Sequence, residues 1–409
     1  MQSSRAVLIA GGIACALMTG AIPAGAAVTP SAPAHAHYVH ASSAVSANPA
    51  ISSGRLHWRI DERLALDYTQ SPTENPTGYS FLDVEPVGPN DAWAVGTSGY
   101  YDLFWGHPVW RHWHDGKWIS PPVPAWMNGA KPGGWVNELE AVGGSSPNNV
   151  WAMGSLLLVT ETVDRAVHWN GKHWSRAAVP SRGAFAPTIT SIVATSDSSA
   201  WAFGCYCGAS DSPFIAHYFR GRWHDVTPAN LGTTGGIDTA SVISPSNIWA
   251  VAAQPNIDIS NVLHWNGRRW SVVRMPASLA FGADRFFAGG GILATKTGGI
   301  WLAGAVGSSY KPAIIHFYRG RWTITKIAAP DYLTALVSDG HGGMWSASWP
   351  VGNISAQIWH YTAGRWSRSA NPAGIKPQYR ITWMAAVPGS RTTLGIGIDT
   401  KNELLLSSR

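Results

Sequence analysis

The chain has 409 residues, 23 of them tryptophan, and a formal net charge of +6. The positive charge comes mostly from arginines scattered one or two per segment, so the chain has no concentrated basic stripe, and we exclude a nucleic-acid partner. Beyond the first 27 residues, no apolar run approaches the ~20 residues needed to cross a bilayer, so we expect no membrane span.

Residues 1–27 are predicted to be a secretory signal peptide. Arg5 lies in a short basic region, an apolar run covers residues 6–22, and small residues at 24–26 are typical of a cleavage site. Cys15 lies in the middle of the apolar run, which is a poor context for lipidation. We therefore expect a secreted protein that is extracellular or held at the cell surface.

Residues 28–53 are predicted to be a disordered leader. Alanine, serine, proline and histidine dominate this stretch, and a composition so poor in large apolar side chains cannot bury enough surface to offset the entropy of ordering. His35, His37 and His40 lie in it, but a short histidine tract in a flexible tail is usually incidental. No metal site is predicted.

An internal repeat runs through the rest of the chain. Each unit has a leading tryptophan, and successive leading tryptophans are 44 to 58 residues apart. Each unit also has a histidine six residues before a second tryptophan, with a glycine between them. The leading tryptophans are Trp93, Trp151, Trp201, Trp249, Trp301 and Trp345, the histidines are His112, His168, His217, His264, His316 and His360, and the second tryptophans are Trp118, Trp174, Trp223, Trp270, Trp322 and Trp366. Periods of this length are typical of stacked all-β units.

The third unit shows how such a repeat becomes four strands. Residues 189–194 and 200–204 are β-rich runs on either side of a polar turn, and two further runs, ending at Phe219 and Val226, are separated by a glycine turn. Four strands per unit at this period predict an all-β fold, a β-propeller of four-stranded antiparallel blades.

The two ends of the chain indicate how the ring closes. The last unit has runs at 381–387 and 393–398 and a third run near residue 405, but no outer strand with its histidine and tryptophan. Residues 54–59 look like a detached outer strand, with Trp58 in the position of the second tryptophan. We therefore predict a seven-bladed propeller over residues 54–409, whose last blade is closed by the N-terminal strand.

The repeated tryptophans and histidines are predicted to be structural. Trp93 and Val95 face one side of a blade and the flanking alanines the other, because side chains alternate along a strand. One histidine per unit places these rings all round the propeller, so no convergent metal or catalytic site is expected. We expect each imidazole to bond to a backbone carbonyl or to a neighbouring blade. A shallow site repeated in every blade, as in lectin propellers, is the functional alternative.

Cys205 and Cys207 are the only cysteines after the signal peptide, and Tyr206 lies between them. Export favours oxidation, so a local disulfide is one prediction and two free thiols are the other. A Cys-Tyr redox cofactor is a further alternative, but it would need copper-binding histidines nearby. The sequence therefore identifies no cofactor.

Aromatic residues outside the repeat pattern gather in the first two units, on the face that carries the segments between blades. We predict a binding surface there for an extracellular glycan or protein, because exposed aromatic side chains in an exported protein suit such ligands. Packing of the long loops against one another is the alternative. The residues are Tyr100, Tyr101, Phe104 and Trp105 in the longest hairpin, and Trp126 and Trp135 in the longest segment between blades.

Four carboxylates lie on the predicted innermost strands of the same two units. They are Asp83, Glu85, Glu138 and Glu140. Carboxylates on adjacent strands beside the channel could bind a cation, or act as the acid and base of a glycoside hydrolase. The alternative is an acidic, solvated channel entrance with no catalytic role.

Several segments resemble those of secreted bacterial tryptophan-rich propellers, which are related in style to kelch and BNR-like repeats. These are Pro-Asn-Asp-Ala-Trp-Ala-Val-Gly at 89–96, its echoes at 147–154 and 245–251, and His-Trp-Asn-Gly-Lys-His-Trp at 168–174. The resemblance covers residues 54–400 and implies a propeller but no single activity, since such propellers include binders and enzymes alike. The chain differs from kelch repeats because it lacks a diglycine after strand two. It also lacks the full Asp-box of sialidase-type BNR repeats, which argues against a sialidase.

The sequence favours a non-catalytic module that binds glycan or protein. No set of histidine, tyrosine, arginine and carboxylate converges from the motif spacing, so an enzyme is the less favoured class. The enzyme alternative is a polysaccharide-active glycoside hydrolase or lyase that uses the channel carboxylates.

Overall fold

The computed structural model describes residues 57–65, 79–98, 107–127, 134–158, 162–182, 186–206, 212–231, 235–254, 257–280, 286–287, 291–297, 299–307, 311–327, 329, 332–348 and 355–408. The predicted signal peptide and leader lie outside these ranges, as do residues 54–56 of the predicted closing strand. Among the residues that are described, no helix has the length and apolar character needed to span a membrane.

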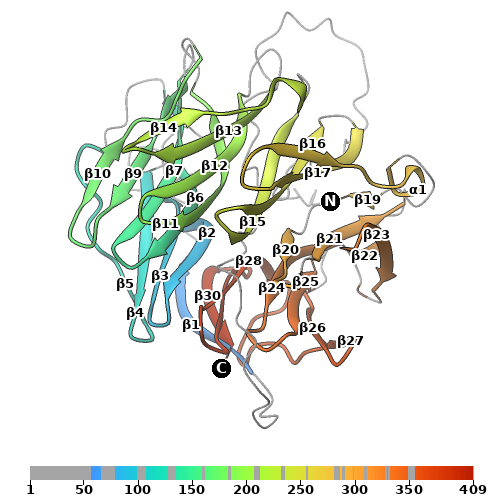
Figure 1. Cartoon of the computed structure of the whole chain (residues 1–409). Coiled ribbons are helices and arrows are strands. Elements are labelled where there is room, and N and C mark those ends of the chain that lie inside the picture. The colour runs from blue at the N-terminus through green and yellow to red at the C-terminus, as the bar shows by residue number, and fades with distance from the viewer. Residues whose placement is uncertain are drawn as a thin grey trace, which may run out of the picture.

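The described strands form seven antiparallel sheets arranged as the blades of a propeller, with one edge strand of each sheet nearest the common centre (Figure 1). Strands that follow one another in the chain pair with one another, so each blade is a meander that runs outward from the centre. The predicted all-β fold with seven four-stranded blades is confirmed.

The first three blades follow the predicted strand order. Blade 1 comprises β2 (Tyr79–Gly88), β3 (Asp91–Ser98), β4 (His107–His114) and β5 (Lys117–Ile119). Blade 2 comprises β6 (Gly134–Ser146), β7 (Asn149–Leu158), β9 (Ala166–Trp169) and β10 (Trp174–Ala177), with the short β8 (Thr162–Asp164) also paired to β7. Blade 3 comprises β11 (Thr188–Ser196), β12 (Ser199–Tyr206), β13 (Ser212–Phe219) and β14 (Arg222–Asp225).

The next three blades have the same order. Blade 4 comprises β15 (Gly236–Ser244), β16 (Asn247–Gln254), β17 (Ile257–Trp265) and β18 (Trp270–Val273). Blade 5 comprises β19 (Phe286–Phe287) and β20 (Ile292–Ala294), which both pair with β21 (Ile300–Val306), then β22 (Lys311–Tyr318) and β23 (Arg321–Lys326). Blade 6 comprises β24 (Leu333–Ser338), β25 (Met344–Ser348), β26 (Ile358–Thr362) and β27 (Arg365–Arg368). A 3-10 turn, η2 (Ala229–Leu231), and a one-turn helix, α1 (Ala277–Ala280), lie between blades.

Blade 7 is assembled from both ends of the described chain. Its inner strands are β28 (Arg380–Ala386), β29 (Thr393–Ile398) and β30 (Asn402–Ser408), and its outer strand is β1 (Trp58–Ala65). β1 pairs antiparallel with β30, and the two lie side by side in Figure 1. The predicted closure by an N-terminal strand is confirmed, although this strand continues further along the chain than the sequence indicated.

The blades pack through tryptophans that meet edge to face. At four interfaces the leading tryptophan of one blade contacts the outer-strand tryptophan of the next, at an interplanar angle between 82° and 86°. The pairs, with their ring-centroid distances, are Trp93 and Trp174 at 5.1 Å, Trp151 and Trp223 at 5.2 Å, Trp201 and Trp270 at 5.6 Å, and Trp345 and Trp58 at 5.7 Å. Trp58 therefore takes the same position in blade 7 that the second tryptophans take elsewhere.

Side chains on the two faces of a strand join different cores. In blade 1, Trp93 and Val95 belong to the apolar cluster shared with blade 2, whereas Ala92 and Ala94 belong to the cluster shared with blades 6 and 7. This arrangement confirms the predicted alternation, and the alanines leave room for the large side chains of the neighbouring blade.

Each repeated histidine stacks on the leading tryptophan of its own blade. The two residues are opposite one another on adjacent strands, and their ring centroids are 3.8 to 4.1 Å apart at interplanar angles of 8° to 22°. The structure thus supports the framework role of the repeated histidines, but the hydrogen-bond partners of their imidazoles differ from the predicted ones. In four blades the imidazole Nε2 lies 2.7 to 3.0 Å from a side-chain oxygen two residues before the leading tryptophan, in Asp91, Asn149, Ser199 and Asn247.

The remaining two blades differ at this position. In blade 6 the Nε2 atom of His360 lies 2.8 Å from Asp339 Oδ2, and Asp339 belongs to the turn before β25. Blade 5 has Gly299 instead, and a Cβ atom there would lie 2.8 Å from His316 Nε2. The predicted partners of the imidazoles, a backbone carbonyl or a neighbouring blade, were wrong. A polar side chain at or near the start of the leading tryptophan's strand lies within hydrogen-bond distance of the imidazole instead.

Cys205, at the end of β12, is disulfide-bonded. Both other cysteines, Cys15 and Cys207, lie outside the described residues. The free-thiol alternative for Cys205 is therefore discarded, and a mainly structural role stays the prediction for this residue.

We predict that Trp58→Ala lowers the free energy of unfolding by about 3 to 5 kcal/mol, because it removes a buried indole and leaves a cavity against Trp345. Arg59→Ala is the matched control, since this neighbouring side chain is exposed and hydrogen-bonds to Asp61 and to the buried Ser407. Chemical denaturation would measure both changes. Equal stability of the Trp58→Ala variant and wild type would contradict the closure of blade 7 by β1.

We also predict that His217→Gln reduces the loss of stability in acid. Burial lowers the pKa of His217 to about 4, so the folded state holds the ring neutral while the unfolded chain takes up a proton as the pH falls through its ordinary value near 6.5. Wild type therefore loses stability from this group between about pH 6.5 and pH 4. Unfolding free energies at pH 7.5 and pH 5 should differ less in the variant than in wild type, and identical differences would contradict the prediction.

Candidate functional site

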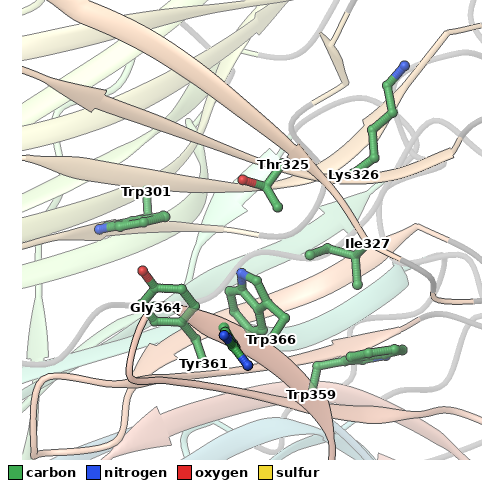
Figure 2. Close-up of a pocket in the computed structure, with 9 residues that line it drawn as sticks. Trp301, Thr325, Lys326, Ile327, Trp359, Tyr361, Gly364 and Trp366 are labelled. Atoms are coloured by element: carbon green, nitrogen blue, oxygen red, sulfur yellow. The ribbon is translucent and has the colours of Figure 1, made fainter.

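A pocket of about 450 Å³ lies between blades 5 and 6. β23 of blade 5 supplies Thr325 and Lys326, and the outer strands of blade 6 supply Tyr361 and Trp366. Figure 2 shows Thr325 on the opposite side of the opening from Tyr361 and Trp366, with Trp301 at one end and the Lys326 side chain directed away from these rings. The pocket lies between the outer parts of two blades and not on the loop face near blades 1 and 2.

The pocket exists because the tryptophan framework opens at this interface. Five leading tryptophans are at most 6% exposed, whereas Trp301 is only partly buried. Across the interface its ring contacts Tyr361, with centroids 5.4 Å apart, and Tyr361 in turn contacts Trp366 at 5.3 Å. Phe317 of blade 5 has the corresponding place between Trp249 and Trp322, so the partial exposure of Trp301, and not the aromatic contact, distinguishes this interface.

The walls of the pocket combine flat aromatic surface with hydrogen-bond donors and positive charge. The indole nitrogens of Trp359 and Trp366 are buried and have no hydrogen-bond partner among the described residues. Lys326 and Arg365 are exposed, and none of the described residues that line the pocket is acidic. Such a surface can stack against a ring, donate hydrogen bonds and attract an anionic group.

Sequence reasoning missed this site, although one signal was present. Trp359 stands immediately before the framework histidine of blade 6, and it has no part in the repeat pattern. The corresponding residues of the other blades are Arg111, Val167, Ala216, Leu263 and Ile315. An extra tryptophan at a position that is otherwise variable would have indicated an unusual sixth blade.

The predicted aromatic surface on the loop face is described only in part. Trp126 is 37% exposed, and the Arg176 guanidinium lies 4.5 Å from the centre of its ring. Trp135, expected in the segment between blades, lies within β6 because this inner strand begins earlier than its pattern indicates. Tyr100, Tyr101, Phe104 and Trp105 lie outside the described residues. Binding at this surface stays a prediction.

Asp83, one of the predicted channel carboxylates, connects two blades. It is 1% exposed, and its oxygens accept hydrogen bonds from the backbone nitrogens of Val84 at 2.8 Å and Val142 at 2.9 Å. Val142 belongs to β6 of blade 2. Ser191 Oγ accepts a similar bond from the Ala240 nitrogen at 3.2 Å between blades 3 and 4. Asp83 therefore contributes to the joint between blades.

Glu85 lies next to Asp83 on β2, opposite Trp93 in the strand register. It is 6% exposed, and its Oε2 atom has no hydrogen-bond partner among the described residues. Burial, together with the nearby charge of Asp83, raises the pKa of Glu85 well above its ordinary value. A neutral carboxyl is the form that this apolar environment stabilises.

Glu138 and Glu140 form a pair on β6. Ser155 Oγ donates a hydrogen bond to Glu140 Oε1 at 2.9 Å, and Glu138 pairs with Ser155 in the strand register. Burial raises the pKa values of both carboxyls, and the repulsion from Glu140 raises that of Glu138 further. The structure therefore brings these two predicted residues together and favours a shared proton between them.

Glu140 lies at a strand position where two other blades have a hydrogen-bond donor. It occupies a β-bulge, because Leu139 and Ala141 pair with consecutive residues of β7. At the corresponding bulges in blades 3 and 6, Thr190 and Thr334 donate hydrogen bonds to a backbone carbonyl of the next blade. A carboxyl can make that donation only when it is protonated, which agrees with the direction of its pKa shift.

Several buried carboxyls were not predicted, and Glu403 is one that joins two blades. Glu403 on β30 is 3% exposed, and its Oε1 atom accepts a hydrogen bond from the Phe81 nitrogen at 3.0 Å, joining blade 7 to blade 1. Burial raises its pKa well above the ordinary value. The repeat pattern gave no indication of it, because blade 7 lacks the histidine and tryptophans that locate the strands of other blades.

No protein-family model matches the chain, and no curated protein matches it. Solved structures match it in fold: YCF48 bound to a D1 peptide has a TM-score of 0.54 at 14% identity, covering 88% of this chain and 98% of that one. YCF48 from Cyanidioschyzon merolae has a TM-score of 0.53 at 14% identity, covering 86% and 98%. The six-bladed lectin of Aleuria aurantia, described with a fucose recognition mode, has a TM-score of 0.42 at 14% identity, covering 71% and 94%. At this level of sequence identity, the comparisons show a similarity of fold alone.

We predict that Glu138→Gln makes stability less sensitive to alkaline pH. A carboxyl whose pKa is raised by folding stabilises the folded state at low pH, and this contribution is lost as the pH rises through the folded pKa. Glutamine cannot lose a proton, so the variant should lose less unfolding free energy between pH 5 and pH 9. Denaturant titrations across this range would measure it, and an unchanged slope would refute the assigned ionisation.

Proposed function

We propose that this protein is an exported, non-catalytic binding module, and that its ligand is an acidic glycan held in the pocket between blades 5 and 6. The observation that carries the proposal is the partial exposure of Trp301 into that pocket, where every other leading tryptophan is buried. A framework indole left open in this way provides a stacking surface without a further change of fold.

The chemistry of the pocket favours a charged sugar. Pyranose rings present flat C–H faces that pack on indole rings, and Trp301 and Trp366 offer such rings on two sides. The cationic side chains of Lys326 and Arg365 suit a carboxylate or sulfate substituent, since none of the described lining residues is acidic. The Thr325 hydroxyl adds a donor and acceptor for sugar hydroxyls.

A peptide ligand is the second candidate. The YCF48 structure that resembles this chain is bound to a D1 peptide, and a propeller of this shape is therefore compatible with such a ligand. An aromatic pocket with two cations would then accept an acidic peptide segment. The glycan is favoured because the pocket is walled by ring faces and presents few groups that could pair with a peptide backbone.

The enzyme alternative has less support. Asp83 accepts two backbone hydrogen bonds, and both Asp83 and Glu85 are buried between blades. A general acid or base has to reach the bond that breaks, and groups committed to the joint between blades do not meet that requirement. Glu138 and Glu140 stay the candidates for any hydrolase or lyase chemistry.

We predict that Trp366→Ala weakens binding of an acidic oligosaccharide by about tenfold or more, because the stacking partner is lost. Trp322→Ala is the matched control: Trp322 has the same framework position in blade 5, is also partly buried, and does not line the pocket. Both variants should lose similar stability, so a difference in affinity reports the site and not the fold. A glycan array would identify the ligand, and calorimetry would compare the affinities.

Further variants separate the alternatives. Lys326→Ala with Arg365→Ala should weaken binding of the acidic glycan more than that of a neutral analogue. Loss of binding on replacing Trp105, Trp126 and Trp135 by alanine, with no effect of Trp366→Ala, would move the site to the loop face. Hydrolysis of the polysaccharide that is abolished by Glu138→Gln and Glu140→Gln would establish the enzyme instead.

A further inference from the structure

Blade 1 departs from the repeat at two positions that are close in space. Two residues before its leading tryptophan it has Asp91, where the next three blades have Asn149, Ser199 and Asn247 and the following two have glycine. Two residues after its framework histidine it has His114, where the others have Asn170, Phe219, Asn266, Tyr318 and Thr362. Both changes introduce a residue type that binds metals, and both occur beside His112.

We propose that Asp91, His112 and His114 form a zinc-binding site at the edge of blade 1. Asp91 Oδ2 lies 3.0 Å from His112 Nε2 and 3.4 Å from His114 Nδ1, and the three ligand atoms all lie within 4.8 Å of one another. Ligands at about 2.0 to 2.2 Å from a tetrahedral zinc ion are separated by roughly 3.3 Å. The three side chains thus need only small movements to meet a common ion.

The scaffold holds two of the ligands in place before any metal binds. His112 stacks on Trp93 with ring centroids 4.1 Å apart and an interplanar angle of 9°, which fixes the direction of its Nε2 atom. His114 ends β4, directly before a tight turn in which Asp115 and Gly116 both have positive φ, 48° and 79°. Such a turn fixes the register of the hairpin and keeps His114 beside β3.

The surroundings of the three residues fit a metal centre. Asp91 is 8% exposed, and its Oδ1 atom is buried without a hydrogen-bond partner among the described residues, which leaves an anionic oxygen for a cation. His114 Nε2, on the far side of that ring, lies 3.5 Å from Asp115 Oδ2. A carboxylate at this place is the usual outer partner of a metal-bound imidazole, because it selects the tautomer that leaves Nδ1 free to bind.

The donor set favours zinc over calcium and magnesium. Two imidazole nitrogens and one carboxylate oxygen suit a borderline metal better than calcium or magnesium, which prefer oxygen ligands. Three protein ligands leave one tetrahedral position for water or for a ligand from outside. Blade 6 provides an internal contrast, since its His360 and Asp339 pair at 2.8 Å but Thr362 stands where His114 would be needed.

The test uses the full chain with His35, His37 and His40 replaced by glutamine, since these residues could bind zinc independently. After removal of metal with a chelator, calorimetry and elemental analysis should find one zinc ion per chain. His114→Asn and Asp91→Asn, each introduced into this chain, should weaken zinc binding by about tenfold or more. Both substitutions copy residues that blades 2 and 4 carry at the same positions, so the fold should be retained.

His173→Asn is the control, because this exposed histidine lies in the equivalent hairpin of blade 2 and should leave zinc binding unchanged. Zinc should also raise the melting temperature of the parent chain but not that of His114→Asn, since a ligand bound only to the folded state stabilises it. Failure of the parent to bind zinc would overturn the proposal. So would affinity that is unchanged in both His114→Asn and Asp91→Asn, because the ion would then lie elsewhere.

Discussion

The ring depends on the contact between the leading tryptophan of one blade and the outer strand of the next. Each such indole stacks on a histidine of its own blade, and in blades 1 to 4 that histidine lies within hydrogen-bond distance of a polar side chain at the start of the tryptophan's strand. Edge-to-face aromatic pairs contribute about 0.5 to 1.5 kcal/mol beyond the burial of their area. The edge-to-face contact occurs at four interfaces, and Trp58 supplies it in blade 7, which has no second tryptophan of its own.

The blades depart from the repeat where one residue beside this tryptophan contact changes. At the interface of blades 5 and 6, Trp301 contacts Tyr361 but stays partly exposed, and the pocket lies beside it. Blade 5 also has glycine in place of the polar residue that meets the histidine elsewhere. Blade 1 has Asp91 two residues before its leading tryptophan and His114 two residues after its framework histidine. These residues add the proposed zinc ligands, and His112 still stacks on Trp93. The stacked histidine and tryptophan have the same geometry in all six blades that carry them, whereas the residues beside the stack differ in chemistry.

The buried carboxyls show how the inner strands are joined. Asp83 and Glu403 accept backbone hydrogen bonds from the next blade, a task that Ser191 performs with a hydroxyl. Strand pattern could place Asp83 and Glu138 on innermost strands, but it could not show which neighbour each one faces. A β-bulge shifts the alternation of side chains by one residue, so a count of residues along the strand does not give the direction of a side chain beyond it.

The sequence by itself determined the number of blades, the strand order and the structural role of the repeated tryptophans, because these follow from a period and from the alternation of side chains along a strand. It also indicated that the N-terminal segment closes blade 7, since Trp58 matched a residue that the last unit lacked. Tertiary structure alone decided the partners of the histidines, the open position of Trp301 and the approach of His114 to Asp91. Those features depend on distances between residues on different strands or blades, and such distances are set by bulges, turns and the size of a facing side chain, which no single repeat records.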